Sequence, residues 1–396
     1  MPSTFSWVDF ADDDRDKMRD LIATFREKET RDELGLGAIR DSLADQLFPG
    51  TSTIQTRARY FLFVPWIYQD LERRRVPVIE VEKLARRNEI RLITALRTGG
   101  EEEGIIGARA GDELERLPSS IYWAGLGRLG IRKFNGSREQ YHREFSGFRL
   151  HSSRRLHSED EETAANLSWS GSLPEAPSSL LDKCTFEVSK REARYLAERI
   201  WECGSTVFGK LLDEPSEIAG SFVWETAFAK TLAGPLGKLL SHAQNFSEIM
   251  HGAALLYNYM LARSARRMAL TDEYGAKFGL WCERIVAARS RYDDWDLPGF
   301  WKIAAQSVHS ITPKARLFVD DWIRLTLETK KAARLIDDER SVELIKRRES
   351  EVKPNRERLG NARALERWTE ASGAGQIDFR WFRVKTIADD IRRSLS

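Results

Sequence analysis

The chain has 396 residues and a formal net charge of +2; 41% of its residues are hydrophobic and 31% are charged. This composition is too apolar for an intrinsically disordered protein, and the length allows two to three domains. Because the net charge is so small, a surface that is basic throughout is excluded, and any nucleic-acid-binding surface has to be local.

Two helices are expected before the most apolar part of the chain. The first follows Asp12-Asp13-Asp14, whose carboxylates can accept hydrogen bonds from the free amides of a helix start, with a metal site as the alternative. The second is expected over residues 34–47 and ends at Phe48-Pro49-Gly50, which is a turn signal.

The most apolar and aromatic run of the sequence covers residues 54–68. A Ser-x-x-Gln capping box at residues 52–55 predicts a helix over about residues 53–75, kinked at Pro65 because proline lacks an N–H. A helix that is apolar on every side is buried, so other elements are expected to surround it. The alternative is a strand over residues 60–64, followed by a helix that starts at Pro65.

Two motifs further along suggest chemistry that their context does not support. Residues 78–96 predict an amphipathic helix, and its Glu80 and Lys83 have the wrong spacing for a nuclease Glu-x-Lys pair and instead indicate a solvated helix face. Gly125, Gly127 and Gly130 match Gly-x-Gly-x-x-Gly, but no strand precedes them and no acidic residue follows at the required distance. These glycines are expected to shape a loop or a helix end rather than a cofactor site.

Residues 128–155 form a local basic segment with eight Lys or Arg and two Glu residues, interleaved with aromatic side chains. Cations neutralise phosphates and aromatic rings stack on unpaired bases, so the segment predicts nucleic-acid binding. The alternative is a basic helix face whose aromatic residues belong to the core. The predicted nucleic-acid-binding residues are Arg128, Arg132, Lys133, Phe134, Arg138, Arg143, Arg149 and Arg154.

Residues 158–182, rich in acidic residues, serine and proline, predict a linker between an N-terminal domain, residues 1–157, and a C-terminal domain, residues 183–396. The C-terminal part is expected to be helical. A capping box at Ser189 begins a helix that ends near Gly204. A strongly apolar helix over residues 246–268 carries His251 and Tyr257, which could be catalytic, but such a position is more typical of the core.

Three further features complete the C-terminal part. Asp293, Asp294 and Asp296 precede a Pro-Gly pair, which indicates a turn, with a divalent metal site as the alternative. Thr312 and Pro313 are a strong helix start for a helix expected to run to about Arg348. After a glycine-rich turn, residues 377–384 alternate loosely between apolar and charged residues, and a last helix is expected over residues 387–395.

Three stretches resemble a known family. The first lies in the N-terminal part and consists of RDELG at residues 31–35, IRD at 39–41, FPGTST at 48–53 and TRARYFLFVPWIY at 56–68. The second is HGAALLYN at residues 251–258, and the third covers residues 368–383. Together they resemble an uncharacterised bacterial family known as domain of unknown function six-three-six-one. The resemblance implies an association with helicase and nuclease genes in phage-defence gene clusters. No catalytic residues are established for the family, so none is transferred.

Cysteine content and hydropathy bear on the compartment. Cys184, Cys203 and Cys282 are far apart, which fits a reducing cytoplasm and argues against a zinc ribbon or a redox motif. No apolar stretch reaches the ~18 residues of a membrane-spanning helix, and the acidic N-terminus lacks the basic start of a signal peptide. The sequence therefore predicts a cytoplasmic protein without a membrane partner.

The expected fold is mainly α, with two multi-helix domains and minor β content. The expected function is a non-enzymatic nucleic-acid-binding or complex-forming subunit of a bacterial anti-phage defence system, without a cofactor. Its expected partners are DNA or RNA and helicase or nuclease subunits. The defence context depends on the resemblance, and the binding role depends on the basic segment. The alternatives are a metal-dependent nuclease that uses Asp293, Asp294 and Asp296, and a protein–protein scaffold whose aromatic faces bind partners.

Overall fold

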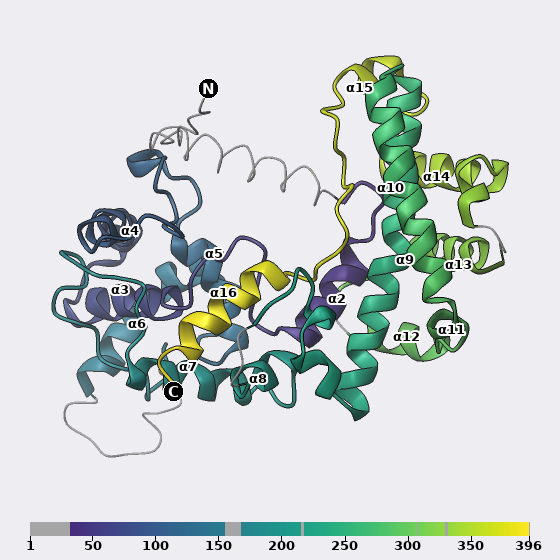
Figure 1. The fold of residues 1–396 in the computed structure, drawn as a ribbon. Helices are drawn as coiled ribbons and strands as arrows, with labels where there is room; N and C mark the ends of the chain where they lie inside the picture. The colour runs from purple at the N-terminus through teal and green to yellow at the C-terminus, as the bar shows by residue number, and fades with distance from the viewer. Residues whose placement is uncertain (1–31, 155–167, 215–217, 307, 329–331, 396) are drawn as a thin grey trace, which may run out of the picture. The chain divides into compact units, whose positions relative to one another are not determined.

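The computed structural model describes residues 32–154, 168–214, 218–306, 308–328 and 332–395, without the side chains of residues 148–154, 332 and 333. The regular secondary structure of these residues is almost entirely helical, which confirms the mainly α fold (Figure 1). Within this part of the chain, β structure is limited to an isolated bridge between Arg132 and Trp169. The first expected helix, after Asp12, lies outside the described residues.

The chain divides into two compact units. Unit 1 comprises the N-terminal part to Leu43 and Ser241–Ile377, and unit 2 comprises Ala44–Leu240 and Asp378–Ser396. The chain therefore passes between the units three times. The predicted division at residues 158–182 stays a prediction; the described part of that segment, residues 168–182, belongs to unit 2.

Helix α3, Tyr60–Arg73, is the centre of unit 2 and confirms the predicted buried helix. Nine consecutive residues, Tyr60–Tyr68, are buried, and Pro65 lies inside the helix, so the alternative of a strand followed by a helix at Pro65 is wrong. A helix with no exposed side requires neighbours all round, and α4 (Val78–Thr98), α5 (Pro118–Arg128) and α6 (Arg138–Arg154) pack against α3.

The helix begins at Tyr60, seven residues later than predicted. Gln55 does accept a hydrogen bond from the amide of Ser52 (3.1 Å), but the Ser52 hydroxyl has no partner among the described residues, so only half of the capping box forms. The amides of the next residues bind distant side chains instead: Thr56 N donates to Tyr122 Oη (2.9 Å), and Ala58 N donates to Asp390 Oδ2 (2.9 Å).

Asp390 comes from the C-terminal helix α16, Trp381–Arg392, which packs on α7 (Lys190–Trp201) and α8 (Val207–Leu212). The capping box of Ser189 and Glu192 at the start of α7 is formed as predicted. The alternating run 377–384 forms no strand; α16 begins at Trp381 because Asp378 accepts the amide of Arg380 (3.0 Å) and turns the chain into a helix. The 3-10 turns of unit 2 are Gly111–Glu113, Val223–Glu225 and Phe228–Thr231.

Unit 1 is built from helices that follow one another along the chain. They are most of α9 (Gly234–Ser264), α10 (Met268–Ala287), α11 (Arg289–Asp293), α12 (Leu297–Ala304), α13 (Pro313–Glu328), the 3-10 helix η5 (Ala332–Ile336), α14 (Glu339–Val352) and α15 (Ala362–Glu366). The single helix expected over residues 313–348 is wrong, since the chain forms α13, η5 and α14 there. Asp338 accepts the amide of Arg340 (2.9 Å) and caps a new helix, which separates α14 from α13.

The first part of α2 (Gly37–Leu47) also belongs to unit 1. This helix confirms the one expected over residues 34–47 but starts later, because Asp32 accepts hydrogen bonds from the amides of Leu36 (2.6 Å) and Gly37 (2.8 Å). The carboxylate therefore takes the place of the first helical turn.

Helices α9 and α10 pack closely at a glycine. A Cβ atom on Gly252 of α9 would lie 2.2 Å from the ring of Trp281 on α10. The Trp281 ring is buried, and its Nε1 donates to the carbonyl of Glu248 one turn earlier on α9 (2.8 Å). The missing side chain thus allows an indole to lie directly on the helix backbone.

Across the described residues, none of the helices combines the length and apolar character needed to cross a bilayer. The three cysteines are free thiols.

Candidate functional site

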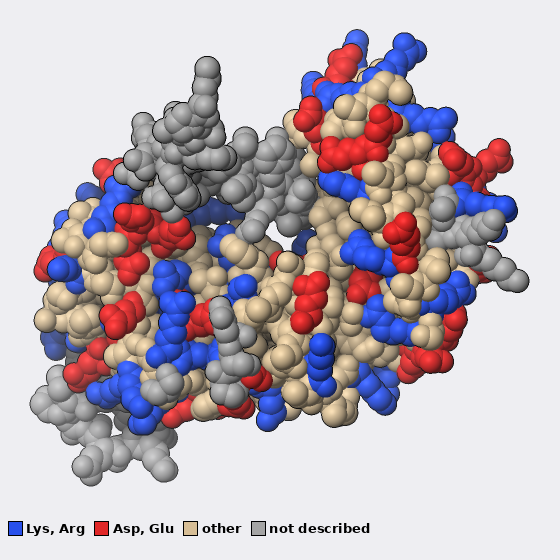
Figure 2. Space-filling view, viewed as in Figure 1, with Lys and Arg blue, Asp and Glu red and all other residues tan. Residues whose placement is uncertain are grey.

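Three of the predicted nucleic-acid-binding cations are exposed on unit 2. Arg128 ends α5, Lys133 lies in the following loop, and Arg143 lies on α6. Within the described residues their side chains have no hydrogen-bond or ion-pair partner. On the face of the molecule in Figure 2, Lys and Arg side chains are interspersed with Asp and Glu, so this face is not uniformly basic.

Arg132 and Arg138 have internal partners instead. The Arg132 guanidinium lies 4.9 Å from the ring of Trp123 and donates to the carbonyls of Trp123 (3.3 Å) and Gly136 (3.1 Å), and burial lowers its pKa. Arg138 donates to the hydroxyl of Ser119 (3.2 Å). These two cations hold the loop and α6 in place, which leaves them less able to neutralise a phosphate.

The remaining predicted residues fall into two groups. Phe134 is half-buried, with its ring 5.8 Å from that of Tyr141. Arg149 and Arg154 lie on α6, but their side chains are outside the described part of the structure. The other described aromatic residues of the segment, Tyr141 and Phe145, are buried in the core and cannot stack on a base without unfolding α6.

Two buried carboxylates of unit 2 were not expected from the sequence. Glu89 on α4 is completely buried and accepts hydrogen bonds from Ser119 N (2.7 Å) and Oγ (2.8 Å), and burial raises its pKa to about 7. Glu72 on α3 accepts hydrogen bonds from the hydroxyls of Tyr141 and Ser168, and burial raises its pKa too. Each carboxylate is occupied by partners that hold the helices together. Glu89 does lie at helical spacing from Ala85 and Leu92 on the apolar face of α4, which is the signal that sequence reasoning could have used.

In unit 1, the stretch 251–258 on α9 brings several functional groups together. Asn258 forms two hydrogen bonds with the backbone of Ser372, one from its Nδ2 to the carbonyl and one from the amide to its Oδ1, both 2.9 Å. Asn258 therefore fixes the segment 372–375, which runs beside α9. His251, one of the two candidate catalytic residues of this helix, is half-buried two turns earlier.

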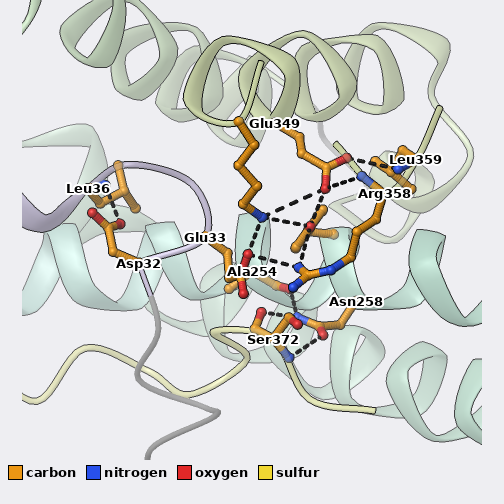
Figure 3. A network of polar contacts seen from close by, with 11 residues as sticks. Asp32, Glu33, Leu36, Ala254, Asn258, Glu349, Arg358, Leu359 and Ser372 are labelled. Atoms are coloured by element: carbon orange, nitrogen blue, oxygen red, sulfur yellow. Dashed lines mark hydrogen bonds and ion pairs between the residues drawn. The ribbon is translucent and has the colours of Figure 1, made fainter. Parts of the chain in front are cut away.

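The other candidate, Tyr257, lies in a charged network that Figure 3 shows from close by. Its hydroxyl donates to Glu349 and accepts from Lys353 Nζ (3.1 Å) and Arg358 Nη1 (3.2 Å). The same two cations bind Glu33, Arg358 at 2.9 Å. The network thus joins the segment before α2 to α9, to α14 and to the loop after α14.

Electrostatics indicate that this network is structural. Burial on its own would raise the pKa of Glu33, but Lys353 and Arg358 outweigh it and the pKa is lowered, so the carboxylate is ionised. Burial and Glu349 raise the pKa of Tyr257, which stays neutral. Glu349 also accepts the amides of Arg358 (2.9 Å) and Leu359 (3.0 Å). The charges of the two carboxylates and the two cations balance. The hydrogen bonds and ion pairs of the five side chains, including Tyr257, are made within the network.

Two of the three acidic residues of the nuclease alternative are also occupied, whereas the third, Asp294, is exposed. Asp293 pairs with Arg289 of its own helix (2.8 Å), and Asp296 caps α12 by accepting the amide of Gly299 (2.9 Å). Nowhere in the described residues do three His, Cys, Asp or Glu side chains come close enough together to hold a metal ion.

Comparison with known proteins identifies the family of this chain. The model of a family of unknown function, DUF6361, matches residues 2–390. The chain belongs to this family. The DUF6361 match spans all three stretches that carry the resemblance, including the His251–Asn258 stretch of α9. No curated protein and no solved structure matches the chain significantly.

Proposed function

We propose that this DUF6361 protein is a non-enzymatic subunit that binds nucleic acid through the phosphate backbone. The observation that carries the proposal is a set of exposed cations on unit 2 whose side chains have no hydrogen-bond or ion-pair partner among the described residues: Arg128, Lys133 and Arg143. In contrast, two other arginines of unit 2 are neutralised, Arg57 by Asp390 (2.8 Å) and Arg59 by Glu192 (2.9 Å).

The mode of binding follows from the neighbours of these cations. Tyr141 and Phe145 are buried, so base stacking contributes little and the contacts are with phosphates. Contacts with phosphates position a protein on a nucleic acid but carry no sequence information. We therefore expect binding with little sequence preference and with similar affinity for single strands and duplexes.

The biological setting of the proposal comes from the resemblance alone. It implies a bacterial anti-phage complex with helicase or nuclease subunits. The free thiols of Cys184, Cys203 and Cys282 agree with a reducing compartment.

The test replaces Arg128, Lys133 and Arg143 together with glutamine. The matched control replaces three exposed lysines of unit 1 without ion-pair partners in the described residues, Lys302, Lys314 and Lys346, and so changes the net charge equally. Fluorescence anisotropy with labelled single strands and duplexes, across a salt series, gives the slope of log affinity against log salt. That slope should flatten by roughly one unit per lost phosphate contact in the first variant and should not change in the control.

Two results would refute the proposal. If both triple variants lose affinity equally, the effect is one of net charge and the three cations are not the contact surface. If the parent protein binds no strand even at low salt, it is not a nucleic-acid-binding protein on its own. In that case the protein–protein scaffold becomes the better hypothesis, and co-purification from the native gene cluster with mass spectrometry would identify its partners.

A further inference from the structure

Unit 1 contains an open pocket of about 720 Å³ between α9, α10 and the segment 374–375. This volume falls within the range of small-molecule sites, which is about 300–1,000 Å³. The pocket is lined by His251, Leu255, Lys277, Leu280, Glu283, Arg284, Ala287, Ala374 and Gly375. Apolar surface makes up most of its lining, and His251, Lys277, Glu283 and Arg284 add polar and charged groups.

The apolar part of the lining includes a side chain that is unusual for a surface. Leu280 is 61% exposed, although it is a large hydrophobic residue in the middle of α10. Leu255 of α9 also lines the pocket and is buried. An apolar ligand body placed between these two leucines would remove the Leu280 side chain from water.

The charged part of the lining is dominated by Arg284. Its only hydrogen-bond partner among the described residues is His251 Nδ1, at 3.5 Å, so most of its five N–H donors are available. Lys277, two turns earlier on α10, forms an ion pair with Glu273 (Nζ to Oε1, 2.7 Å). Glu283 also borders the pocket and is exposed, so Arg284 is the lining cation without an ion-pair partner among the described residues.

His251 adds no positive charge of its own at neutral pH. Burial and the neighbouring Arg284 lower its pKa to about 4, whereas a contact with the backbone of Ala374 acts in the opposite sense. A neutral imidazole whose Nδ1 accepts from Arg284 carries its proton on Nε2. The histidine thus helps to orient the guanidinium rather than compete for an anion.

Both walls of the pocket are held rigidly by residues of the same α9 stretch. Asn258 fixes Ser372 and so the segment with Ala374 and Gly375, and the absence of a side chain on Gly252 lets Trp281 anchor α10. A pocket with fixed walls loses little conformational entropy when a ligand binds.

From this arrangement we propose that the pocket binds a small organic anion with an apolar body. The anionic group pairs with Arg284, assisted by Lys277, and the apolar body lies between Leu255 and Leu280. The site lies entirely in unit 1 and is independent of the nucleic-acid surface proposed for unit 2.

The experiment uses two fluorescent probes that share the same apolar frame. 8-Anilinonaphthalene-1-sulfonate carries a sulfonate, and N-phenyl-1-naphthylamine lacks it. With the full-length protein we expect saturable binding of the sulfonate probe at one site, tighter than that of the neutral probe. Arg284→Gln should weaken the sulfonate probe roughly 3–10-fold, as expected for the loss of a partly exposed charge-assisted hydrogen bond, and leave the neutral probe unchanged.

Two further variants locate the probe. Ala287→Trp places an indole in the pocket from an exposed position at the end of α10, and it should abolish saturable binding of both probes while the helical circular dichroism is kept. Lys302→Gln removes an exposed charge of unit 1 outside the lining and should alter neither affinity. The proposal is overturned if the parent shows no saturable binding, if both probes bind equally well, or if Arg284→Gln or Ala287→Trp binds them as the parent does.

Discussion

The contact between Gly252 and Trp281 allows a quantitative test of how unit 1 is held together. Alanine has a higher helix propensity than glycine by about 0.8–1 kcal/mol, so Gly→Ala inside α9 would stabilise an isolated helix. Here, however, the new Cβ would lie 2.2, 2.4 and 2.5 Å from three atoms of the Trp281 ring. Ordinary contacts between such atoms are about 3.5–4 Å.

The ring has little room to retreat. Its Nε1 is bonded to the Glu248 carbonyl (2.8 Å), and it packs against Phe278 and Trp322 at centroid distances of 5.0 and 6.2 Å. Overpacking of a tight core costs typically 1–3 kcal/mol, and the fixed indole puts this site in the upper part of that range. After subtraction of the propensity gain, Gly252→Ala should lower the free energy of unfolding by about 1–2 kcal/mol.

Guanidinium unfolding, followed by circular dichroism and tryptophan fluorescence, measures this change. Gly279 on α10 is the matched control, because a Cβ there meets nothing within 4 Å, and Gly279→Ala should raise the free energy of unfolding by about 0.5–1 kcal/mol. In a Trp281→Phe background the smaller ring should relieve most of the Gly252→Ala cost, which a double-mutant cycle detects. If Gly252→Ala stabilises the protein as Gly279→Ala does, the close packing of α9 and α10 described here is wrong.

Two other predictions concern single residues. Trp66 is completely buried and its Nε1 donates to the Pro174 carbonyl (2.7 Å), so Trp66→Ala should cost ~3–5 kcal/mol and leave much of the protein insoluble; an unchanged melting temperature would contradict this. Burial and Arg284 lower the pKa of His251 to about 4 in the folded state, below its value in the unfolded chain. At a pH between these two pKa values the unfolded state binds more protons than the folded state, so the free energy of unfolding falls as the pH falls. Between pH 6.5 and pH 5 the parent should lose about 1.5 kcal/mol more than His251→Gln, as urea unfolding at each pH can show.

Local signals in the sequence predicted structure well where the partners are also local. The capping box at Ser189 lies within one helical turn, and it forms. The start of α3 was predicted too early because the competing partners of its amides, Tyr122 and Asp390, are 66 and 332 residues away from Thr56 and Ala58. A sequence pattern over a few residues contains no information on such partners.

The candidate sites show the same limit. Arg132 and Lys133 are neighbours with the same charge, yet Arg132 is bound to backbone carbonyls and Lys133 is exposed. The pocket of unit 1 could not be predicted at all, because it needs α9, α10 and residues 374–375, which only the fold brings together. His251 was named as a possible functional residue, but the sequence did not indicate that Arg284 lies beside it.

The division of the chain into interleaved segments has a consequence for synthesis on the ribosome. Glu33 leaves the ribosome early, but its partner Lys353 is 320 residues further along, which at ~5–20 residues per second is a wait of tens of seconds. Unit 2 waits even longer, because Arg57 and Ala58 lack their carboxylate until Asp390 is made. Unit 1 therefore cannot complete its fold before Lys353 has left the ribosome, and unit 2 cannot do so before Asp390 has. A nascent chain that stops before α16 leaves the amide of Ala58 and the half-buried guanidinium of Arg57 without this carboxylate.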